Sequence, residues 1–73
     1  MPPTNRDVTL RSTYDAEHDV GYLYLSDPGI ESEEQVEVET PSGAELVLDF
    51  DKNGKLIGIE FLPAKELMPD GLR

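Results

Sequence analysis

Residues 49–60, DFDKNGKLIGIE, decide the fold of this 73-residue chain because they fit two incompatible structures. They match the calcium-loop pattern D-x-[DN]-x-[DN]-G-x5-E at every fixed position. They also match two β-strands that are joined by a tight turn at Asn53-Gly54. The first structure predicts a metal-binding protein, and the second predicts a small β-sheet module.

The calcium loop requires oxygen ligands that converge on one ion, with a helix on each side of the loop. Its side-chain ligands would be Asp49, Asp51, Asn53 and Glu60. Residues 44–48 follow Gly43 directly and leave room for little more than one turn of an entering helix. After the loop, Pro63 interrupts any helix that begins at Phe61. The flanking residues therefore argue against a calcium loop.

The hairpin explains the pattern on both sides of the turn, where alternate residues are apolar. A two-residue type I′ turn at Asn53-Gly54 gives three apolar pairs on one face of the hairpin. These pairs are Phe50–Ile57, Leu48–Ile59 and Leu46–Phe61. A shift of one residue would destroy that face. Glu60 would lie ~20 Å along the strand from Gly54, too far to share a metal with Asn53. We therefore predict the hairpin.

The length of the chain predicts a single small domain. A core of this size supplies only ~3–5 kcal/mol of net stability, and the sequence has no cysteine for a disulfide or a thiolate metal site. Self-association is the usual remaining means of stabilising so small a chain, so we expect a homo-oligomer. We divide the chain into a disordered N-terminal arm (residues 1–7), a β-rich domain (8–68) and a tail (69–73).

The net charge of −10 is concentrated in the middle of the chain. Between Arg11 and Lys52 there are twelve Asp and Glu residues and no Lys or Arg. Nucleic-acid binding needs cationic side chains, so we expect no nucleic-acid partner. The acids either maintain solubility and prevent stray strand pairing, or they form a docking surface at residues 27–39 for a basic protein.

The sequence also indicates where the protein resides. No stretch approaches the ~20 apolar residues of a membrane span, and the first seven residues lack the apolar core of a signal peptide. We therefore expect a cytoplasmic protein that makes no contact with a membrane.

Alternating apolar patterns predict five strands, at residues 8–14, 20–25, 34–40, 45–50 and 55–62. Residues 20–25 and 55–62 are apolar on both faces and suit central positions, whereas the glutamate-rich 34–40 suits an edge. This predicts an antiparallel order of 1-2-5-4-3, with a simple meander as the alternative. A short C-terminal helix at 64–68 would cover part of one face. The predicted fold class is mainly β (α+β at most), a single small antiparallel sheet of about five strands with the 49–60 hairpin.

Two blocks of the sequence resemble a known family. Residues 14–25, YDAEHDVGYLYL, resemble Y-D-x-E-x-D-x-x-Y-I-x-L, and residues 46–60, LVLDFDKNGKLIGIE, resemble V-I-L-D-F-D-x-x-G-x-L-V-G-I-E. In this order and spacing they are similar to the small bacterial domain-of-unknown-function family 2283. The chain departs from that pattern at Gly21, where a larger apolar residue is common, at Pro63, and in the long acidic connection at 26–40.

The resemblance implies that the 49–60 pattern belongs to a β-hairpin signature and not to an EF-hand. It implies no catalytic residue. Small acidic proteins of this kind are sometimes regarded as antitoxin-like partners of neighbouring small proteins, and the resemblance suggests such a role for this chain.

The residues themselves assign no catalytic, cofactor-binding or metal-binding site. His18 is the only histidine, and its polar surroundings favour a solvated turn residue over a catalytic base. The neighbouring acids would either bind a hard cation weakly or bond to backbone donors of the turn; they are Asp15, Glu17 and Asp19. Tyr14, Tyr22 and Tyr24 could form an aromatic patch, but the period-two pair Tyr22 and Tyr24 is typical of half-buried sheet packing.

The leading hypothesis is therefore a non-enzymatic, self-associating β-module that acts through protein contacts, with a basic protein as a second partner. The alternative is weak divalent-cation binding at Asp15/Glu17/Asp19 or at Asp49/Asp51. Neither hypothesis requires a cofactor.

Overall fold

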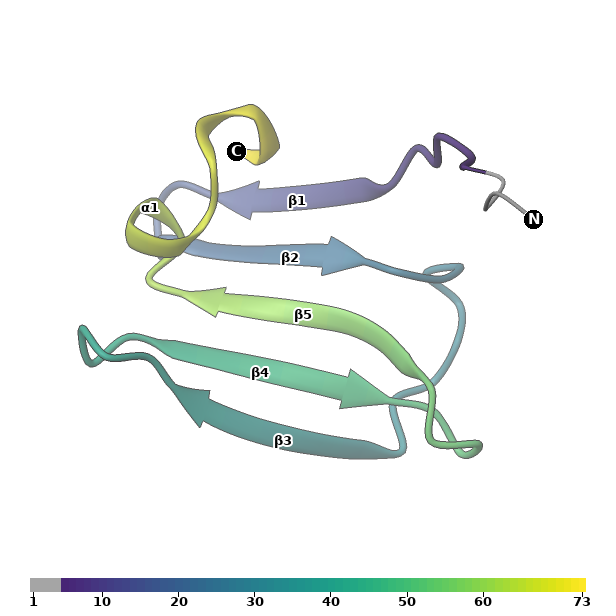
Figure 1. The fold of residues 1–73 in the computed structure, drawn as a ribbon. Helices are drawn as coiled ribbons and strands as arrows, with labels where there is room; N and C mark the ends of the chain where they lie inside the picture. The colour runs from purple at the N-terminus through teal and green to yellow at the C-terminus, as the bar shows by residue number, and fades with distance from the viewer. Residues whose placement is uncertain (1–4) are drawn as a thin grey trace.

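The computed structural model describes residues 5–73 and contains a single layer of five antiparallel strands (Figure 1). The strands are β1 (Arg11–Asp15), β2 (Val20–Tyr24), β3 (Glu34–Glu39), β4 (Glu45–Phe50) and β5 (Leu56–Leu62). Their order in the sheet is β1-β2-β5-β4-β3, and every neighbouring pair is antiparallel. The predicted fold class and strand order are confirmed, and the meander is not formed.

The first strand begins at Arg11 and not at Val8, which corrects the predicted start. Arg11 pairs with Tyr24, the last residue of β2, so the sheet has no neighbouring strand for residues 8–10. Val8 and Leu10 are accordingly exposed. Of the arm expected at residues 1–7, residues 1–4 lie outside the described residues.

The hairpin between β4 and β5 has the predicted pairs Leu46–Phe61 and Leu48–Ile59, but its turn differs from the prediction. The Asp51 amide donates to the Lys55 carbonyl, which leaves a three-residue loop instead of the two-residue type I′ turn. Gly54 has φ 78°. Asn53 lacks the positive φ that a type I′ turn requires, because the only non-glycine residue of 5–73 with positive φ is Asp19. A type I turn followed by a left-handed glycine fits these angles.

The longer turn changes the pairing next to it. Phe50 pairs with Leu56, while Asp49 pairs with Gly58, so Ile57 is left over as a β-bulge. The predicted pair Phe50–Ile57 is therefore wrong. Asp51 explains why the longer turn forms, because its Oδ1 accepts hydrogen bonds from the amides of Asn53 and Lys55 at 2.8 and 2.9 Å.

The register divides the side chains of the sheet into two faces of opposite character. One face, called here the apolar face, carries Tyr14, Leu23, Val36, Val38, Leu46, Leu48, Phe50, Ile59 and Phe61. The other, called here the acidic face, carries five acidic residues, Glu37, Glu39, Glu45, Asp49 and Glu60, together with the apolar or aromatic Val20, Tyr22, Tyr24, Val47 and Leu62. Alternation along each strand produces this division, because successive side chains point to opposite faces.

The C-terminal segment, α1 (Ala64–Leu67) with the 3-10 turn η1 (Asp70–Leu72), covers one corner of the apolar face (Figure 1). Met68 lies against Gly21, where an added Cβ would meet Met68 Sδ. The hydroxyl of Ser12 donates to the Leu72 carbonyl at 2.9 Å, so part of the segment expected as a tail packs on β1. The expected partial cover of one face by a C-terminal helix is confirmed.

The core of the domain is small. The buried apolar residues are Ala44, Val47, Ile57, Ala64 and Met68. Within residues 5–73 no large side chain is completely buried, and Val36 and Val38 of the apolar face remain 40% and 38% exposed. Neither helical segment of the described chain has the length or the apolar composition to cross a bilayer.

Candidate functional site

A buried carboxylate, Asp49, is the centre of the polar network on the acidic face. Tyr22 Oη donates to its Oδ2 at 2.5 Å, and Gln35 Nε2 donates to its Oδ1 at 2.8 Å. Ser32 Oγ donates to the same Oδ1 at 3.3 Å. Asp49 is only 6% exposed, so these donors compensate the desolvation of its charge. The network ties the β2–β3 connection and β3 to the sheet.

Gly58 creates the space for this contact. Asp49 pairs with Gly58 on β5, and Gly58 pairs with Tyr24 on β2, so the glycine lies between the two strands that carry Asp49 and Tyr22. A Cβ at Gly58 would lie 1.9 Å from the hydroxyl oxygen of Tyr22. The tyrosine ring therefore crosses β5 at the one position where the strand has no side chain.

Tyr22 is held as a neutral hydrogen-bond donor. Burial raises the pKa of its phenol well above the ordinary value, and the hydrogen bond to the Asp49 carboxylate raises it further. Its ring also packs edge-on against Tyr24, with the ring centroids 4.7 Å apart. The half-buried sheet packing predicted for these two tyrosines is confirmed. The un-ionised phenol and the hydrogen-bonded carboxylate thus join β2 to β4.

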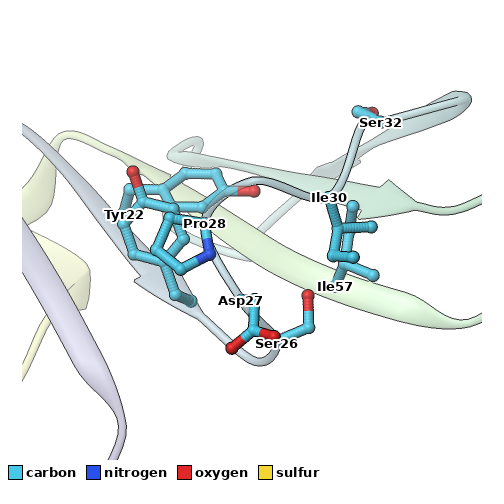
Figure 2. Close-up of a pocket in the computed structure, with 8 residues that line it drawn as sticks. Tyr22, Ser26, Asp27, Pro28, Ile30, Ser32 and Ile57 are labelled. Carbon is cyan, nitrogen blue, oxygen red and sulfur yellow. The ribbon is translucent and has the colours of Figure 1, made fainter.

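A pocket lies between the sheet and the β2–β3 connection, next to this network (Figure 2). Its walls come from Tyr22, Ile57, Pro28 and Ile30, among others, and Ile30 lies beside Ile57 in the figure. Its volume is about 190 Å³. Ligand sites usually occupy ~300–1,000 Å³. The pocket is thus too small for most organic ligands.

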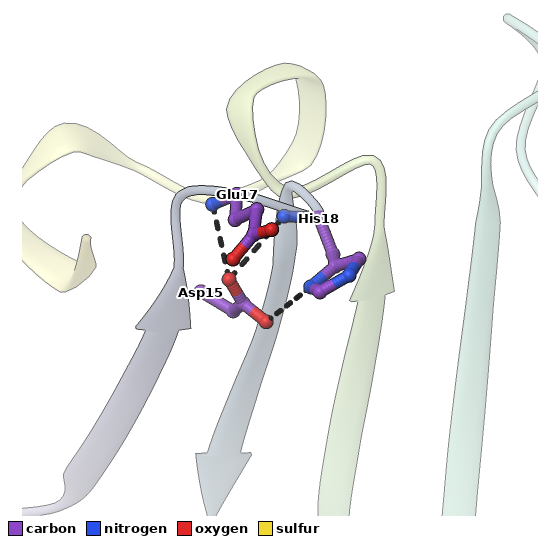
Figure 3. Close-up of side chains that lie close together, drawn as sticks. All are labelled: Asp15, Glu17 and His18. Carbon is purple, nitrogen blue, oxygen red and sulfur yellow. Dashed lines mark hydrogen bonds and ion pairs between the residues drawn. The ribbon is translucent and has the colours of Figure 1, made fainter.

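A second group of titratable side chains forms in the turn between β1 and β2 (Figure 3). Ligand atoms of Asp15, Glu17 and His18 lie within 4.8 Å of one another, the only such group that could hold a metal within residues 5–73. Asp15 Oδ1 accepts from the Glu17 and His18 amides, and Asp15 Oδ2 lies 2.7 Å from His18 Nδ1. The side-chain bond to His18 and these amide bonds lower the pKa of Asp15. The turn chemistry predicted for Asp15 is confirmed.

The predicted cation group needs one correction, because His18 and not Asp19 joins Asp15 and Glu17. Asp19 adopts φ 53° and points to the C-terminal segment. Its Oδ1 accepts from the Lys65 amide at 2.9 Å, and its carbonyl accepts from the Ala64 amide at 2.8 Å. Asp19 therefore anchors the start of α1.

The four residues of the calcium pattern do not converge. Asp49 is saturated by donors from β2, the connection and β3, and Asp51 bonds to its own turn. Glu60 pairs with Tyr22 and Val47 in the middle of the sheet, away from the turn that holds Asn53. The carboxylates of the alternative Asp49/Asp51 cation site thus both accept hydrogen bonds from the protein itself.

With this geometry established, comparison with known proteins gives one positive result. Residues 11–65 match the family described as "Protein of unknown function (DUF2283)". The chain belongs to the DUF2283 family. No curated protein and no solved structure matches the DUF2283 chain.

The match includes all five strands of the DUF2283 chain and the first residues of α1. The family carries no assigned function, so the chemistry of this member has to be inferred from its own residues.

The Tyr22–Asp49 pair was not predicted, because Asp49 was considered only as a possible metal ligand. Two signals in the sequence point to its burial. Asp49 shares a face with Val47, and the predicted register already places Gly58 on the neighbouring strand at the level of Asp49. A carboxylate opposite a glycine leaves room for a side chain from the next strand.

Proposed function

We propose that this protein is a non-enzymatic protein-interaction module that acts by self-association. One observation carries the proposal: one face of the five-stranded sheet is apolar, and the chain's own C-terminal segment covers just one corner of it. A domain that completely buries no large side chain within residues 5–73 gains stability when a partner covers that face. Small chains without disulfides commonly rely on association in this way.

The chemistry of the polar groups supports the non-enzymatic part of the proposal. Both oxygens of the buried Asp49 already accept hydrogen bonds, and Tyr22 holds its proton strongly. The pocket beside them is small. A catalytic acid or base needs a pKa near the working pH and room for a substrate. The raised pKa of Tyr22 and the small pocket do not meet these two requirements.

The direct test is sedimentation equilibrium of the purified chain over a wide range of concentrations. We expect an average mass above the 8.1 kDa of one chain, rising with concentration to a plateau. A mass of 8.1 kDa at every concentration would contradict self-association.

A basic protein is the second partner that we propose, and it would meet the acidic segment 27–39. Every residue of this segment is exposed, and no residue in it takes part in an ion pair within the described chain. Complementary charge accelerates association and is sensitive to salt. An antitoxin-like role, in which an acidic protein covers a basic neighbour, would be one form of this interaction.

The basic partner is tested by affinity capture from the native host's lysate at low and at high salt. We expect one basic protein to be retained at low salt, released at high salt, and lost when Glu31, Glu33 and Glu37 are changed to Gln. Retention by this triple variant would show that the segment is not the contact surface.

Weak divalent-cation binding at Asp15, Glu17 and His18 is the second candidate function. The closeness of their ligand atoms favours it. Against it, Asp15 already accepts two amide hydrogen bonds and one from His18. Calorimetry with calcium, magnesium and manganese decides the matter, with Asp15→Asn as the control. A saturable heat that the control lacks would establish the site.

A further inference from the structure

We propose that a second copy of this chain packs on the apolar face, sheet against sheet, and forms a homodimer with both acidic faces turned outward. This inference rests on the proposed self-association and adds the surface and the arrangement. The contact would centre on β3, β4 and β5, because the C-terminal segment already occupies the side of β1 and β2 at Ser12 and Gly21.

The side chains available on β3, β4 and β5 form a continuous apolar surface. Val38 pairs with Leu46, which pairs with Phe61. Two residues along each strand, Val36, Leu48 and Ile59 form the next row on the same face. None of these six side chains is fully buried, and Val36 and Val38 are the most exposed of them. Cross-strand rows of this kind are normally covered by a second layer, since a sheet has to bury its apolar face.

The accessible surface of the chain is larger than that of a compact protein of the same mass. The chain has 5569 Å² of accessible surface. A compact folded chain of 8.1 kDa would have about 4,500 Å². The difference is about 1,100 Å². A standard interface buries ~800 Å² on each partner.

Charge determines which face a second copy can occupy. On the acidic face, contact between two copies would bring together the carboxylates of Glu37, Glu39, Glu45 and Glu60 from each chain. On the apolar face the register places one acidic residue among the strands, Glu34, at the end of β3. A chain of net charge −10 therefore meets its own copy with least repulsion across the apolar face.

The height of the C-terminal segment is compatible with this packing. Two sheets packed face to face lie ~10 Å apart, and a helix with its side chains is ~10 Å across. The α1 helix thus fits on the first sheet beside the second sheet and does not hold the two sheets apart. It would stop the partner from sliding over β1 and β2.

The test compares neighbouring positions of β3 that point to opposite faces. Val36→Lys with Val38→Lys places two charges in the proposed interface, and the control Glu37→Lys places one on the acidic face. Val36 and Val38 are already 40% and 38% exposed, so the double variant should fold as a monomer, which circular dichroism checks. Sedimentation velocity then gives the dimer dissociation constant of each protein.

We expect the wild type and Glu37→Lys to form dimers, and the double valine variant to dissociate with a constant at least tenfold higher. Loss of the dimer in Glu37→Lys alone, or a dimer unaffected by either change, would overturn the apolar face as the interface while self-association stands. A wild type that is monomeric at every concentration would remove the proposed self-association itself, and an unlike partner would then be the occupant to seek.

Discussion

Tyr22 and Asp49 are 27 positions apart in the chain, yet the tyrosine hydroxyl lies 2.5 Å from Asp49 Oδ2. The contact joins β2 to β4 across β5, and Gly58 makes it possible. Asp49 is in turn bonded to Gln35 of the edge strand β3. One buried carboxylate thus connects three of the five strands, β2, β3 and β4, with the β2–β3 connection.

Removing the hydroxyl of Tyr22 should destabilise the fold. Tyr22→Phe leaves Asp49 Oδ2 buried without its donor, and an unsatisfied buried group costs ~1–3 kcal/mol. Urea unfolding of wild type and variant measures the difference. Tyr24→Phe is the control, because its ring packs against Tyr22 while its hydroxyl makes no side-chain hydrogen bond within residues 5–73. Equal losses in the two variants would contradict a specific role for the Tyr22 hydroxyl.

Gly21 should not tolerate a side chain. A Cβ there would lie 1.9 Å from Met68 Sδ and 3.2 Å from the Ala64 Cβ, so Gly21→Ala has to displace α1. Overpacking of this kind costs ~1–3 kcal/mol. Thermal unfolding should show a lower Tm for Gly21→Ala, whereas Gly29→Ala, which meets nothing within 4 Å, should leave the Tm close to that of the wild type. A neutral Gly21→Ala would mean that α1 packs loosely.

In the turn at residues 51–55, alanine substitutions at two neighbouring positions should differ in their effect on stability. Gly54 has φ 78°, and a side chain there costs ~1 kcal/mol or more. Asn53 has no such requirement, so Asn53→Ala should be nearly neutral. Denaturant unfolding of Gly54→Ala and Asn53→Ala distinguishes this loop from a type I′ turn, in which both substitutions would be costly.

The pKa of Asp15 should lie below its ordinary value of 3.8, because His18 and two backbone amides bond to the carboxylate. A folded-state pKa that is depressed contributes stability above pH 3.8, and this contribution disappears as the pH falls through the folded value. A carboxyl titration by NMR measures the pKa directly. In His18→Ala the pKa of Asp15 should rise, and an unchanged value would show that the side-chain bond is not formed in solution.

Salt should stabilise the fold. The twelve acids between Arg11 and Lys52 face no Lys or Arg within that interval, and the ion pairs of the described chain are His18–Asp15 and Arg73–Asp70. Screening of like charges should therefore raise the Tm between low and moderate sodium chloride. A Tm that does not change with salt would mean that the carboxylates are too far apart for their repulsion to affect stability.

The fold was predictable because its determinants are local. Period-two alternation located the strands, and apolar residues on both faces of β2 and β5 placed those strands in the centre, which was sufficient for the order β1-β2-β5-β4-β3. The turn was predicted less well. Asn53-Gly54 favours a type I′ turn, but Asp51 stabilises a loop one residue longer, and that residue shifts Phe50 from Ile57 to Leu56.

The contacts of the candidate sites also divide into those that the sequence predicts and those that it does not. The turn role of Asp15 involves residues two and three positions away and was therefore predictable from the sequence. The bonds of Asp49 to Tyr22 and Gln35, and the contact of Gly21 with Met68, join residues that are distant in the chain. Gly21 departs from the family pattern. The structural reason for a glycine at this position is the close approach of Met68, which only the structure shows.

By itself, the sequence determined the alternation of the strands, the acidic composition and the membership in the DUF2283 family, because each depends on the order of residues along the chain. Only the tertiary structure decided that Asp49 is a buried acceptor, that α1 covers a single corner, and that most of the apolar face stays open. Burial depends on which distant strands meet and what lies on top of them. The local pattern at Asp49 indicates only its face and the glycine opposite it, and not the donors that reach it.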